Sequence, residues 1–276
     1  MQAELQGALR KMRVGLDQGV AQYELVCGDQ TLALNTLLGR QVRLRHLGEI
    51  NCIHCGRKTK KSFNQGYCYP CFTKLAECDS CIVSPEKCHY HLGTCRDPAW
   101  GEQYCFQSHI VYLANSSGIK VGITRGTQVP TRWIDQGAVQ ALPILRVDSR
   151  YQSGLVEHLF KAEVADKTNW RKMLKGEVEA LDLKAERDRL FDVIAAPLGE
   201  VERQFGLQAI QRLDAEELQI DYPVLNYPLK VSSLNLDKTP EVGGQLQGIK
   251  GQYLILDSGV INLRKFTAYQ VEFSSE

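Results

Sequence analysis

The sequence predicts an α+β fold in which a zinc-knuckle module precedes a domain of one hairpin plus helices and a β-rich C-terminal region. Three observations predict it. Nine of the ten cysteines fall in the window Cys52–Cys105. Segments with alternating apolar and polar residues lie on both sides of that window, and an apolar stripe at helical spacing follows a hairpin pattern. With 43% hydrophobic and 24% charged residues in 276, the composition is that of a globular chain.

Composition shifts along the chain divide it into five predicted segments. The prior for a chain of this length is two domains or three. The segments are an N-terminal β-rich segment (1–50), a zinc-binding module (51–107), a hairpin-plus-helices domain (108–176), a helical connector (177–217) and a C-terminal β-rich domain (218–276). Alternatively, the two β-rich segments pair into one domain, a question that their spacing leaves open.

The N-terminal segment is predicted to contain strands. Apolar and polar residues alternate in Gln22–Cys27 and again in Gln41–His46, and Gly28 and Gly39 supply turns beside them. Cys27 stands apart from the other cysteines, so we expect it in the core.

No segment is predicted to target or cross a membrane. The bases near the start of the chain are followed by no apolar run, so no signal peptide is expected. No stretch approaches the ~20 apolar residues of a membrane span. We therefore expect a cytoplasmic protein with no membrane partner, in which clustered thiols stay reduced and favour metal over disulfides.

The strongest motif is a pair of CxxC knuckles. Cys52 and Cys55 are followed, after twelve residues, by Cys68 and Cys71. Each knuckle places two thiolates on one turn, and two knuckles supply the four-sulfur shell of a zinc ion. Because four thiolates leave no open coordination position, this zinc is expected to be structural, and the module to fold only with its metal.

A second structural zinc site is predicted directly after the first. The predicted ligands are Cys78, Cys81, Cys88 and Cys95. The fourth ligand is the open one, because His91, His89 or Cys105 can replace Cys95. Cys105 is equally well explained as a buried core thiol.

The central domain is predicted to begin with a hairpin. His109–Ala114 and Ile119–Thr124 read as two strands around a short turn. A short helix is expected within Thr131–Ala141 and a third strand at Ile144–Val147. An amphipathic helix is expected at Ser153–Ala165, with its first residue as N-cap.

The last third of the chain changes from helical to strand-like patterns. Residues 178–218 are charged with helical periodicity, which is broken at Pro197–Gly199. Residues 218–273 show short apolar runs punctuated by glycine, a pattern that predicts a small β-sheet or β-barrel unit.

A net charge of +1 hides a strong asymmetry. Residues 40–75 carry eight bases and one acid, residues 120–175 ten bases and five acids, and residues 176–276 ten bases and seventeen acids. Basic segments attract phosphates, so nucleic acid is the expected partner. Alternatively, such a basic segment is a surface that contacts only solvent. The acidic C-terminal region suits a protein partner.

Aromatic residues stand among the bases of the cysteine window. They are Phe63, Tyr67, Tyr69 and Phe72. Rings between cations suit base stacking, which favours single-stranded DNA or RNA. The same rings can instead pack around the zinc.

The central hairpin carries a resemblance to a known superfamily. Ile110-Val111-Tyr112 followed by Lys120-Val121-Gly122, with Arg132 and Glu157 downstream, resembles the paired tripeptides of the GIY-YIG nucleases, and is closest to their phage-associated branch. The likeness covers about residues 108–175. The whole chain also resembles a bacterial zinc-containing family that is known only as a domain of unknown function.

The resemblance implies metal-dependent cleavage of phosphodiesters. By position, Tyr112 would activate water, Arg132 would steady the phosphate and Glu157 would hold Mg²⁺. A family asparagine is matched loosely by Asn169. Lys120 stands where the superfamily usually has tyrosine, and can contact phosphate instead.

Three classes of function therefore remain open. The first is a zinc-stabilised nuclease-like enzyme, and the second is a non-catalytic RNA- or DNA-binding module of the same architecture. The third is a protein-interaction adaptor. Salt dependence separates the first two from the third, and the requirement for a divalent metal separates the first from the second.

Overall fold

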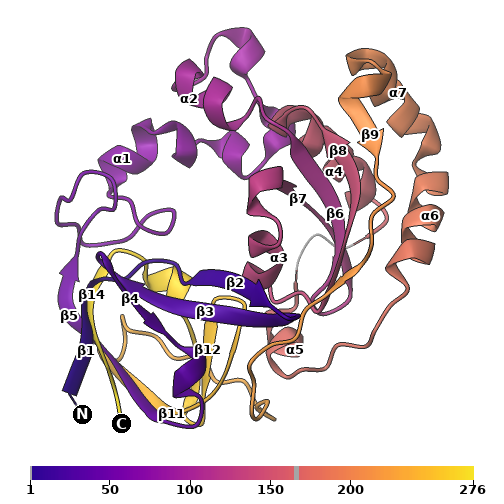
Figure 1. Ribbon diagram of the computed structural model, residues 1–276. Helices are drawn as coiled ribbons and strands as arrows, with labels where there is room; N and C mark the ends of the chain where they lie inside the picture. Colours follow the sequence, from indigo (N-terminus) through magenta and orange to yellow (C-terminus); the bar gives the residue numbers. More distant parts are fainter. Residues whose placement is uncertain (1, 165–167) are drawn as a thin grey trace.

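The computed structural model describes residues 2–164 and 168–276 and confirms the predicted mixture of helices and strands. Its strands form three sheets, and a run of short helices and turns joins two of them (Figure 1). Among the described helices, none combines the length and apolar character needed to cross a lipid bilayer.

The largest sheet is built from both ends of the chain. Strand β14 lies between β1 and β5, and β11 lies on the other side of β5. The segments 1–50 and 218–276 therefore share one antiparallel sheet, which answers the question that the sequence left open. In order across the sheet, the strands are β1 (Gln2–Ala8), β14 (Tyr269–Ser275), β5 (Gln41–Ile50), β11 (Glu241–Lys250), β12 (Tyr253–Leu256) and β13 (Gly259–Asn262).

A three-stranded sheet packs beside the large one. It consists of β2 (Arg13–Asp17), β3 (Val20–Cys27) and β4 (Gln30–Ala33). Cys27 ends β3 fully buried, and burial raises the pKa of its thiol to about 12, so it is a core residue as predicted.

The metal module, residues 51–107, runs as an arc from the large sheet to the central sheet (Figure 1). It contains no strand of three residues or more among its described residues. Its elements are α1 (Tyr69–Lys74), the 3₁₀ turns η2 (Ala76–Cys78), η3 (Ser80–Ile82), η4 (Pro85–Lys87) and η5 (Tyr90–Leu92), and α2 (Pro98–Tyr104).

The central sheet contains the predicted hairpin, which the structure confirms. Tyr112 of β6 lies opposite Gly122 of β7 in the antiparallel register. The strand order is β10 (Leu218–Gln219), β8 (Gln140–Val147), β6 (His109–Asn115) and β7 (Ile119–Arg125), and β9 (Ile210–Arg212) also pairs with β8.

Helices cover the central sheet and link it to the larger one. Helix α3 (Thr131–Asp135) buries Trp133 and Ile134 in the core that also holds the strands of both terminal segments. Its position therefore joins the hairpin to the terminal sheets. The other helices are α4 (Arg150–Lys161), α5 (Trp170–Leu174), α6 (Leu183–Val193) and α7 (Ala195–Phe205).

Several predicted boundaries were wrong. Helix α4 begins at Arg150, because Ser149 and Gln152 form a capping box; Ser153 lies inside the helix and donates to the Arg150 carbonyl. The helix predicted over Thr131–Ala141 is only α3, since β8 pairs with β6 from Gln140 onward.

The helical break of the connector also lies elsewhere. It falls at Ile194, between α6 and α7, and Pro197 belongs to the first turn of α7. A proline is tolerated there because the first-turn N–H groups have no partner within the helix.

Candidate functional site

The first four predicted zinc ligands lie together. Cys52, Cys55, Cys68 and Cys71 place their sulfurs within 4.8 Å of one another. The Sγ atoms of Cys55 and Cys68 are 3.7 Å apart. Zn–S bonds of about 2.3 Å in a tetrahedron require sulfurs about 3.8 Å apart. The donor set and its spacing therefore fit a structural zinc ion.

Backbone turns hold the first knuckle in this form. The Gly56 N–H donates to the Cys52 carbonyl at 2.9 Å, and Gly56 takes a φ of 70° that favours glycine. Burial alone would raise the pKa of the Cys52 thiol, but backbone N–H groups of Cys55, Cys68 and His54 lower it to about 6. The thiolate form that a metal binds is thus favoured before the metal arrives.

The second knuckle begins a helix. Cys68 is the N-cap residue of α1, Pro70 lies in the first turn, and the Phe72 N–H donates to the Cys68 carbonyl at 2.9 Å. Phe63 stacks on Phe72 at 5.7 Å between ring centroids, so part of the aromatic set packs beside the zinc site. Tyr69, in contrast, is 60% exposed.

The second group of cysteines is arranged differently from the prediction. Among the described residues, the other close group of metal-ligating side chains is Asp79, Cys81 and His89. Cys78 is buried beside Asn64, towards the first knuckle pair. Separately, Cys81, Cys88, Cys95 and Cys105 line one small cavity.

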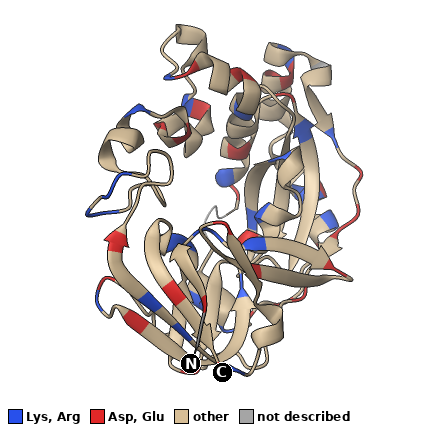
Figure 2. Cartoon of the chain, turned by 60° about the vertical axis from the view of Figure 1, so that its left-hand side comes forward, with Lys and Arg blue, Asp and Glu red and all other residues tan. Residues whose placement is uncertain are grey.

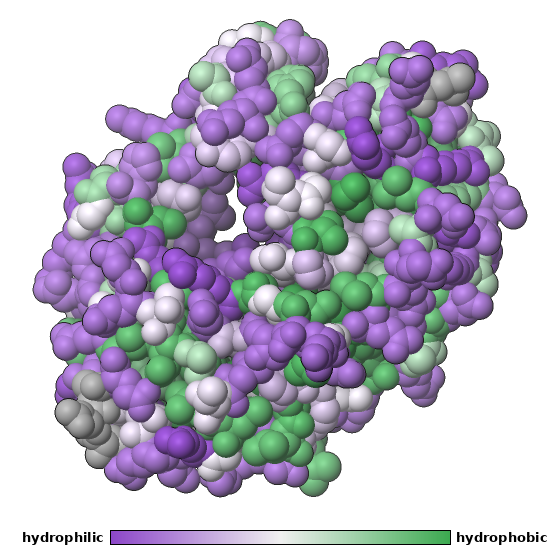
Figure 3. Space-filling model, viewed as in Figure 1, coloured by the Kyte–Doolittle hydropathy of each residue, from purple (hydrophilic) through white to green (hydrophobic). Residues whose placement is uncertain are grey.

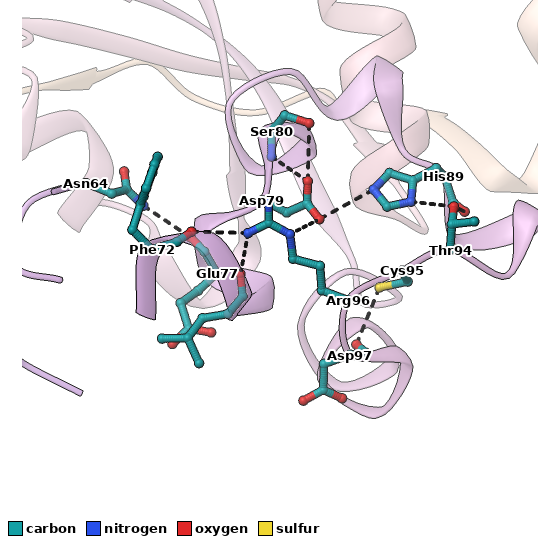
Figure 4. Close-up of polar contacts among 11 residues, drawn as sticks. Asn64, Phe72, Glu77, Asp79, Ser80, His89, Thr94, Cys95, Arg96 and Asp97 are labelled. Carbon is teal, nitrogen blue, oxygen red and sulfur yellow. Dashed lines mark hydrogen bonds and ion pairs between the residues drawn. The ribbon is translucent and has the colours of Figure 1, made fainter. Parts of the chain in front are cut away.

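Asp79 connects the two halves of the metal module (Figure 4). Its carboxylate accepts from the Ser80 N–H at 2.6 Å and from Arg96 Nε at 2.9 Å. Arg96 also donates to the carbonyls of Phe72 and Leu75, at and just after α1, each at 3.2 Å. Burial opposes ionisation of Asp79, yet the Ser80 N–H and Arg96 lower its pKa. The residue is therefore an ionised structural link.

A cleft of about 490 Å³ lies where the three parts of the chain meet. The space-filling view shows the surface hollowed between the metal module and α3 (Figure 3). Two carboxylates line it, Asp135 and Glu157, against a larger number of cations. The cationic lining residues are Lys11, Lys120, Arg125, Arg132, Arg150, Lys161 and Arg264. Figure 2 shows in blue where the Lys and Arg residues of the chain lie along the backbone.

Tyr112 lies beneath this cleft. Its ring is fully buried, its hydroxyl donates to Gln136 Oε1 at 3.0 Å, and Trp133 packs edge-on against it. Burial raises the pKa of Tyr112 to about 12, although the adjacent Arg132 opposes the shift. The hydroxyl is therefore protonated at neutral pH.

Lys120 and Arg132 place two cations close together. Lys120 is 5% exposed, and its Nζ donates to Thr168 Oγ1 at 2.7 Å. Burial, together with the positive charge of Arg132, lowers the pKa of Lys120 to about 7. An anion in the cleft would relieve this repulsion, so the pair favours a bound phosphate.

Arg150 adds a third, partly buried cation. Its Nη2 donates to the Ile82 carbonyl at 2.5 Å, and its Nε is buried with no partner among the described residues. Burial lowers the pKa of this guanidinium. The position was not predicted, because only the packing of α4 against η4 brings it to the cleft.

The two carboxylates have different surroundings. Glu157 is 12% exposed and forms an ion pair with Lys161 at 3.1 Å, one helical turn away. Lys11 Nζ donates to Asp135 Oδ2 at 2.5 Å, and Gln252 Nε2 donates to Asp135 Oδ1 at 2.8 Å. Each carboxylate of the cleft wall is therefore paired with a lysine.

Asn169 lies away from these residues. Its side chain accepts from the Lys172 N–H at 3.2 Å and caps α5, and its own N–H donates to Ser117 Oγ at 2.8 Å. The structure thus brings Lys120, Arg132 and Glu157 to one cleft, with Tyr112 buried beneath it, and leaves Asn169 as a helix cap.

Sequence reasoning missed Lys11 and Arg264 in the cleft. The first lies before β2 and the second after β13, so pairing of the two ends of the chain carries both to the cleft. The basic character of the chain near Lys11 was visible in the sequence, but nothing in it linked that segment to the hairpin.

Comparison with known proteins places the chain in a family. Residues 39–271 match the family described as "Protein of unknown function (DUF2797)". Searches of curated proteins and of solved structures gave no match. The matched range includes both CxxC knuckles, the hairpin and every cleft-lining residue except Lys11. Because it spans well over half of the chain, this protein belongs to the DUF2797 family.

Proposed function

We propose that the chain binds nucleic acid in the cleft and hydrolyses its phosphodiester bonds in a metal-dependent reaction of the GIY-YIG type. The observation that carries the proposal is the concentration of cations around Tyr112, Arg132 and Glu157. Seven Lys or Arg side chains line one cleft. Three of them, Lys120, Arg150 and Arg264, have a pKa lowered first of all by burial, so an anion is the ligand that this wall stabilises.

Different residues of the cleft can take different roles in hydrolysis. Water attacks phosphorus, its oxygen forms the new P–O bond, and the sugar oxygen leaves as the old bond breaks. Arg132 pairs with the phosphate oxygens and offsets the charge that develops on them. A divalent ion held by Glu157 would supply Lewis-acid stabilisation of the same charge.

Two groups near the phosphate can exchange the protons. Tyr112 is protonated at neutral pH and is suited to position the water through its hydroxyl oxygen. Lys120, with a pKa of about 7, is partly neutral at that pH, so it can accept the proton that the water loses and pass it to the leaving sugar oxygen. The lysine in the second tripeptide is thereby compatible with catalysis.

Single-stranded DNA or RNA is the proposed substrate. Tyr69 presents an exposed ring on the metal module, and Lys61 lies over the Phe63 ring at 5.4 Å. Exposed rings next to cations bind unpaired bases by stacking, whereas a duplex keeps its bases covered.

We further propose that the metal module holds two structural zinc ions. One is bound by Cys52, Cys55, Cys68 and Cys71, and the other by the cysteines that follow. Neither four-thiolate shell leaves a position for substrate, so the zinc ions would support the wall of the cleft and take no part in hydrolysis.

A second candidate function is binding without cleavage. Two observations favour it: Tyr112 is fully buried with its hydroxyl donated to Gln136, and Glu157 already forms an ion pair with Lys161. If both contacts persist when nucleic acid is bound, the cleft retains its affinity for phosphate but lacks a free metal ligand.

One gel experiment distinguishes these functions. Labelled single- and double-stranded DNA and RNA are incubated with the protein in Mg²⁺ or in EDTA, alongside Glu157→Gln. The matched control is Asp188→Asn, which neutralises an exposed acid on α6, outside the cleft. Cleavage that needs Mg²⁺, persists in Asp188→Asn and is lost in Glu157→Gln supports hydrolysis.

The other outcomes are equally informative. Retarded but uncut bands for all three proteins support the binding function instead. The absence of both cleavage and retardation at low salt overturns both functions and turns attention to a protein partner of the acidic C-terminal region.

A further inference from the structure

We propose that the second zinc ion is bound by Cys81, Cys88, Cys95 and Cys105, with Cys105 in the place of Cys78. The inference deepens the two-zinc part of the proposed function, and its test does not require any activity on nucleic acid. It makes Cys105 a zinc ligand, whereas the sequence explained Cys105 equally well as a buried core thiol.

The four cysteines surround one enclosed space. They line a cavity of about 20 Å³, whose remaining walls are mainly apolar and include Ile82, Trp100 and Phe106. A volume of this size holds about one water molecule. Apolar walls offer such a water few hydrogen bonds, whereas four thiolates around the same space match the donor set of a structural zinc.

Each sulfur comes from a different turn. Cys81 lies in η3, Cys88 follows η4, Cys95 follows η5, and Cys105 is the C-cap residue of α2. One ion bound to all four would hold every short element of the second half of the module. The sulfurs do not meet the mutual 4.8 Å spacing of the first cluster, so binding would draw them inward as the segment orders.

This segment contributes no side chain to a hydrophobic core. Among the described residues, no hydrophobic side chain from 54 to 108 belongs to any of the three core clusters. Short 3₁₀ turns without a core are marginal by themselves, and small modules of this kind are commonly stabilised by a metal. The absence of a core, like the cavity, therefore favours a metal ion in this segment.

The other candidate ligands for this zinc are Asp79, His89 and Cys78. Asp79 accepts from Ser80 and Arg96, while His89 Nδ1 lies 2.8 Å from Thr94 Oγ1 and His89 Nε2 lies 3.5 Å from Asp79 Oδ2 (Figure 4). Cys78 is buried but does not line the cavity. Besides Asp79, the metal-ligating side chains that line the cavity with Cys81 are the other three thiols.

Arg150 supplies a separate observation. Its backbone N–H donates to the Cys105 carbonyl at 2.8 Å, and its Nη2 donates to the Ile82 carbonyl, one residue after Cys81. The guanidinium therefore lies between two of the proposed ligands, with its Nε buried and unpartnered among the described residues. Zinc bound by four thiolates carries a net charge of −2, and an adjacent guanidinium would offset it.

A zinc ion here would position one wall of the cleft. Ile82, Val83 and Pro85 line the cleft from the side of η3 and η4. Cys105 precedes β6, which carries Tyr112, by four residues. Joining Cys81 and Cys88 to Cys105 therefore ties this wall to the hairpin.

The test is the zinc content of the purified full chain, measured by plasma mass spectrometry. We expect two zinc ions in the native chain, one in Cys105→Ser, and two in Cys78→Ser, which removes a buried thiol outside the cavity. Cys105→His, which restores a ligand, should return the content to two, and it decides the matter if Cys105→Ser does not fold.

Three results would overturn the proposal. They are one zinc ion in the native chain, loss of an ion in Cys78→Ser with none lost in Cys105→Ser, and one ion in a folded Cys105→His. A chain with two zinc ions that neither binds nor cuts nucleic acid leaves this inference intact and overturns the proposed function. The two failures are thus distinguishable.

Discussion

The Tyr112 ring occupies the space that a side chain at residue 122 would need. A Cβ on Gly122 would lie 2.6 Å from the Tyr112 hydroxyl oxygen, closer than Cβ atoms in folded proteins come to other heavy atoms. The two residues face each other across β6 and β7. The glycine of the second tripeptide is therefore a packing requirement of the tyrosine in the first, whatever reaction the cleft performs.

Gly122→Ala should consequently destabilise the chain by about 1–3 kcal/mol, because the added methyl group displaces a fully buried ring. Urea denaturation measures the loss. Gly15→Ala on β2 is the control, since its Cβ would meet nothing within 4 Å and should change stability by less than about 0.5 kcal/mol. Equal effects of the two substitutions would contradict the packing argument.

Nucleic-acid binding should weaken as the pH rises through about 7. Lys120 has its pKa lowered to about 7 by burial and by Arg132, so it carries a charge below that pH and loses it above. A bound phosphate favours the charged form, and affinity should fall about fivefold between about pH 6 and pH 8. Fluorescence anisotropy of labelled nucleic acid at constant salt measures the affinity at each pH.

Lys120→Met should remove this pH step and bind like the native chain at high pH. The exposed Lys172→Met on α5 should keep the step unchanged. A step that survives in Lys120→Met would assign the titration to another group.

Arg132→Ala should weaken single-strand binding about tenfold, because it removes a phosphate contact from the cleft. The slope of log affinity against log salt should fall by about 0.7, the value for one phosphate contact on a single strand. Arg146→Ala, on the exposed face of β8 outside the cleft, should alter neither quantity. Similar slopes for both variants would place the binding surface elsewhere.

Removal of zinc should unfold the metal module and leave the sheets in place. Residues 54–108 contribute to no hydrophobic core cluster of the described chain, whereas the strands do. A strong chelator should therefore open this segment to proteolysis while strand signals in circular dichroism persist. Cys68→Ser should behave like the chelated protein, and the core variant Cys27→Ala should keep its zinc. Protection of the segment without metal would contradict a structural role.

The Asp79–Arg96 ion pair should make the module sensitive to acid. The pKa of Asp79 is lowered in the folded chain, so the ionised carboxylate stabilises the fold above about pH 3.9. This stabilisation is lost as the pH falls through the pKa that Asp79 has in the folded chain. Arg96→Ala should cost about 1–3 kcal/mol at neutral pH, since it leaves a buried carboxylate without its guanidinium partner. Acid titration of the module by tryptophan fluorescence (Trp100 lies in α2) follows the transition. A native-like acid profile in Arg96→Ala would show that the pair contributes nothing.

Local patterns were enough to predict the first zinc site and the hairpin. Cys52 and Cys55 lie on one turn whatever surrounds them, and a turn with strands on each side pairs with itself. The order of Tyr112, Lys120 and Arg132 was equally visible, because the hairpin and α3 are neighbours in the chain. Helix boundaries were less accurate, since the capping box at Ser149 and the pairing of β8 with β6 compete with helical periodicity.

The sequence by itself thus determined the ligand chemistry of the first zinc site, the hairpin and three of the residues that line the cleft, Lys120, Arg132 and Glu157. Only the tertiary structure decided that β14 and β11 both pair with β5, that Lys11 and Arg264 reach the cleft, and that Cys105 lines a cavity that Cys78 does not. The physical reason is distance along the chain. Turns and helices are selected by neighbouring residues, whereas contacts between remote segments depend on which surfaces bury together, and no local periodicity records that choice.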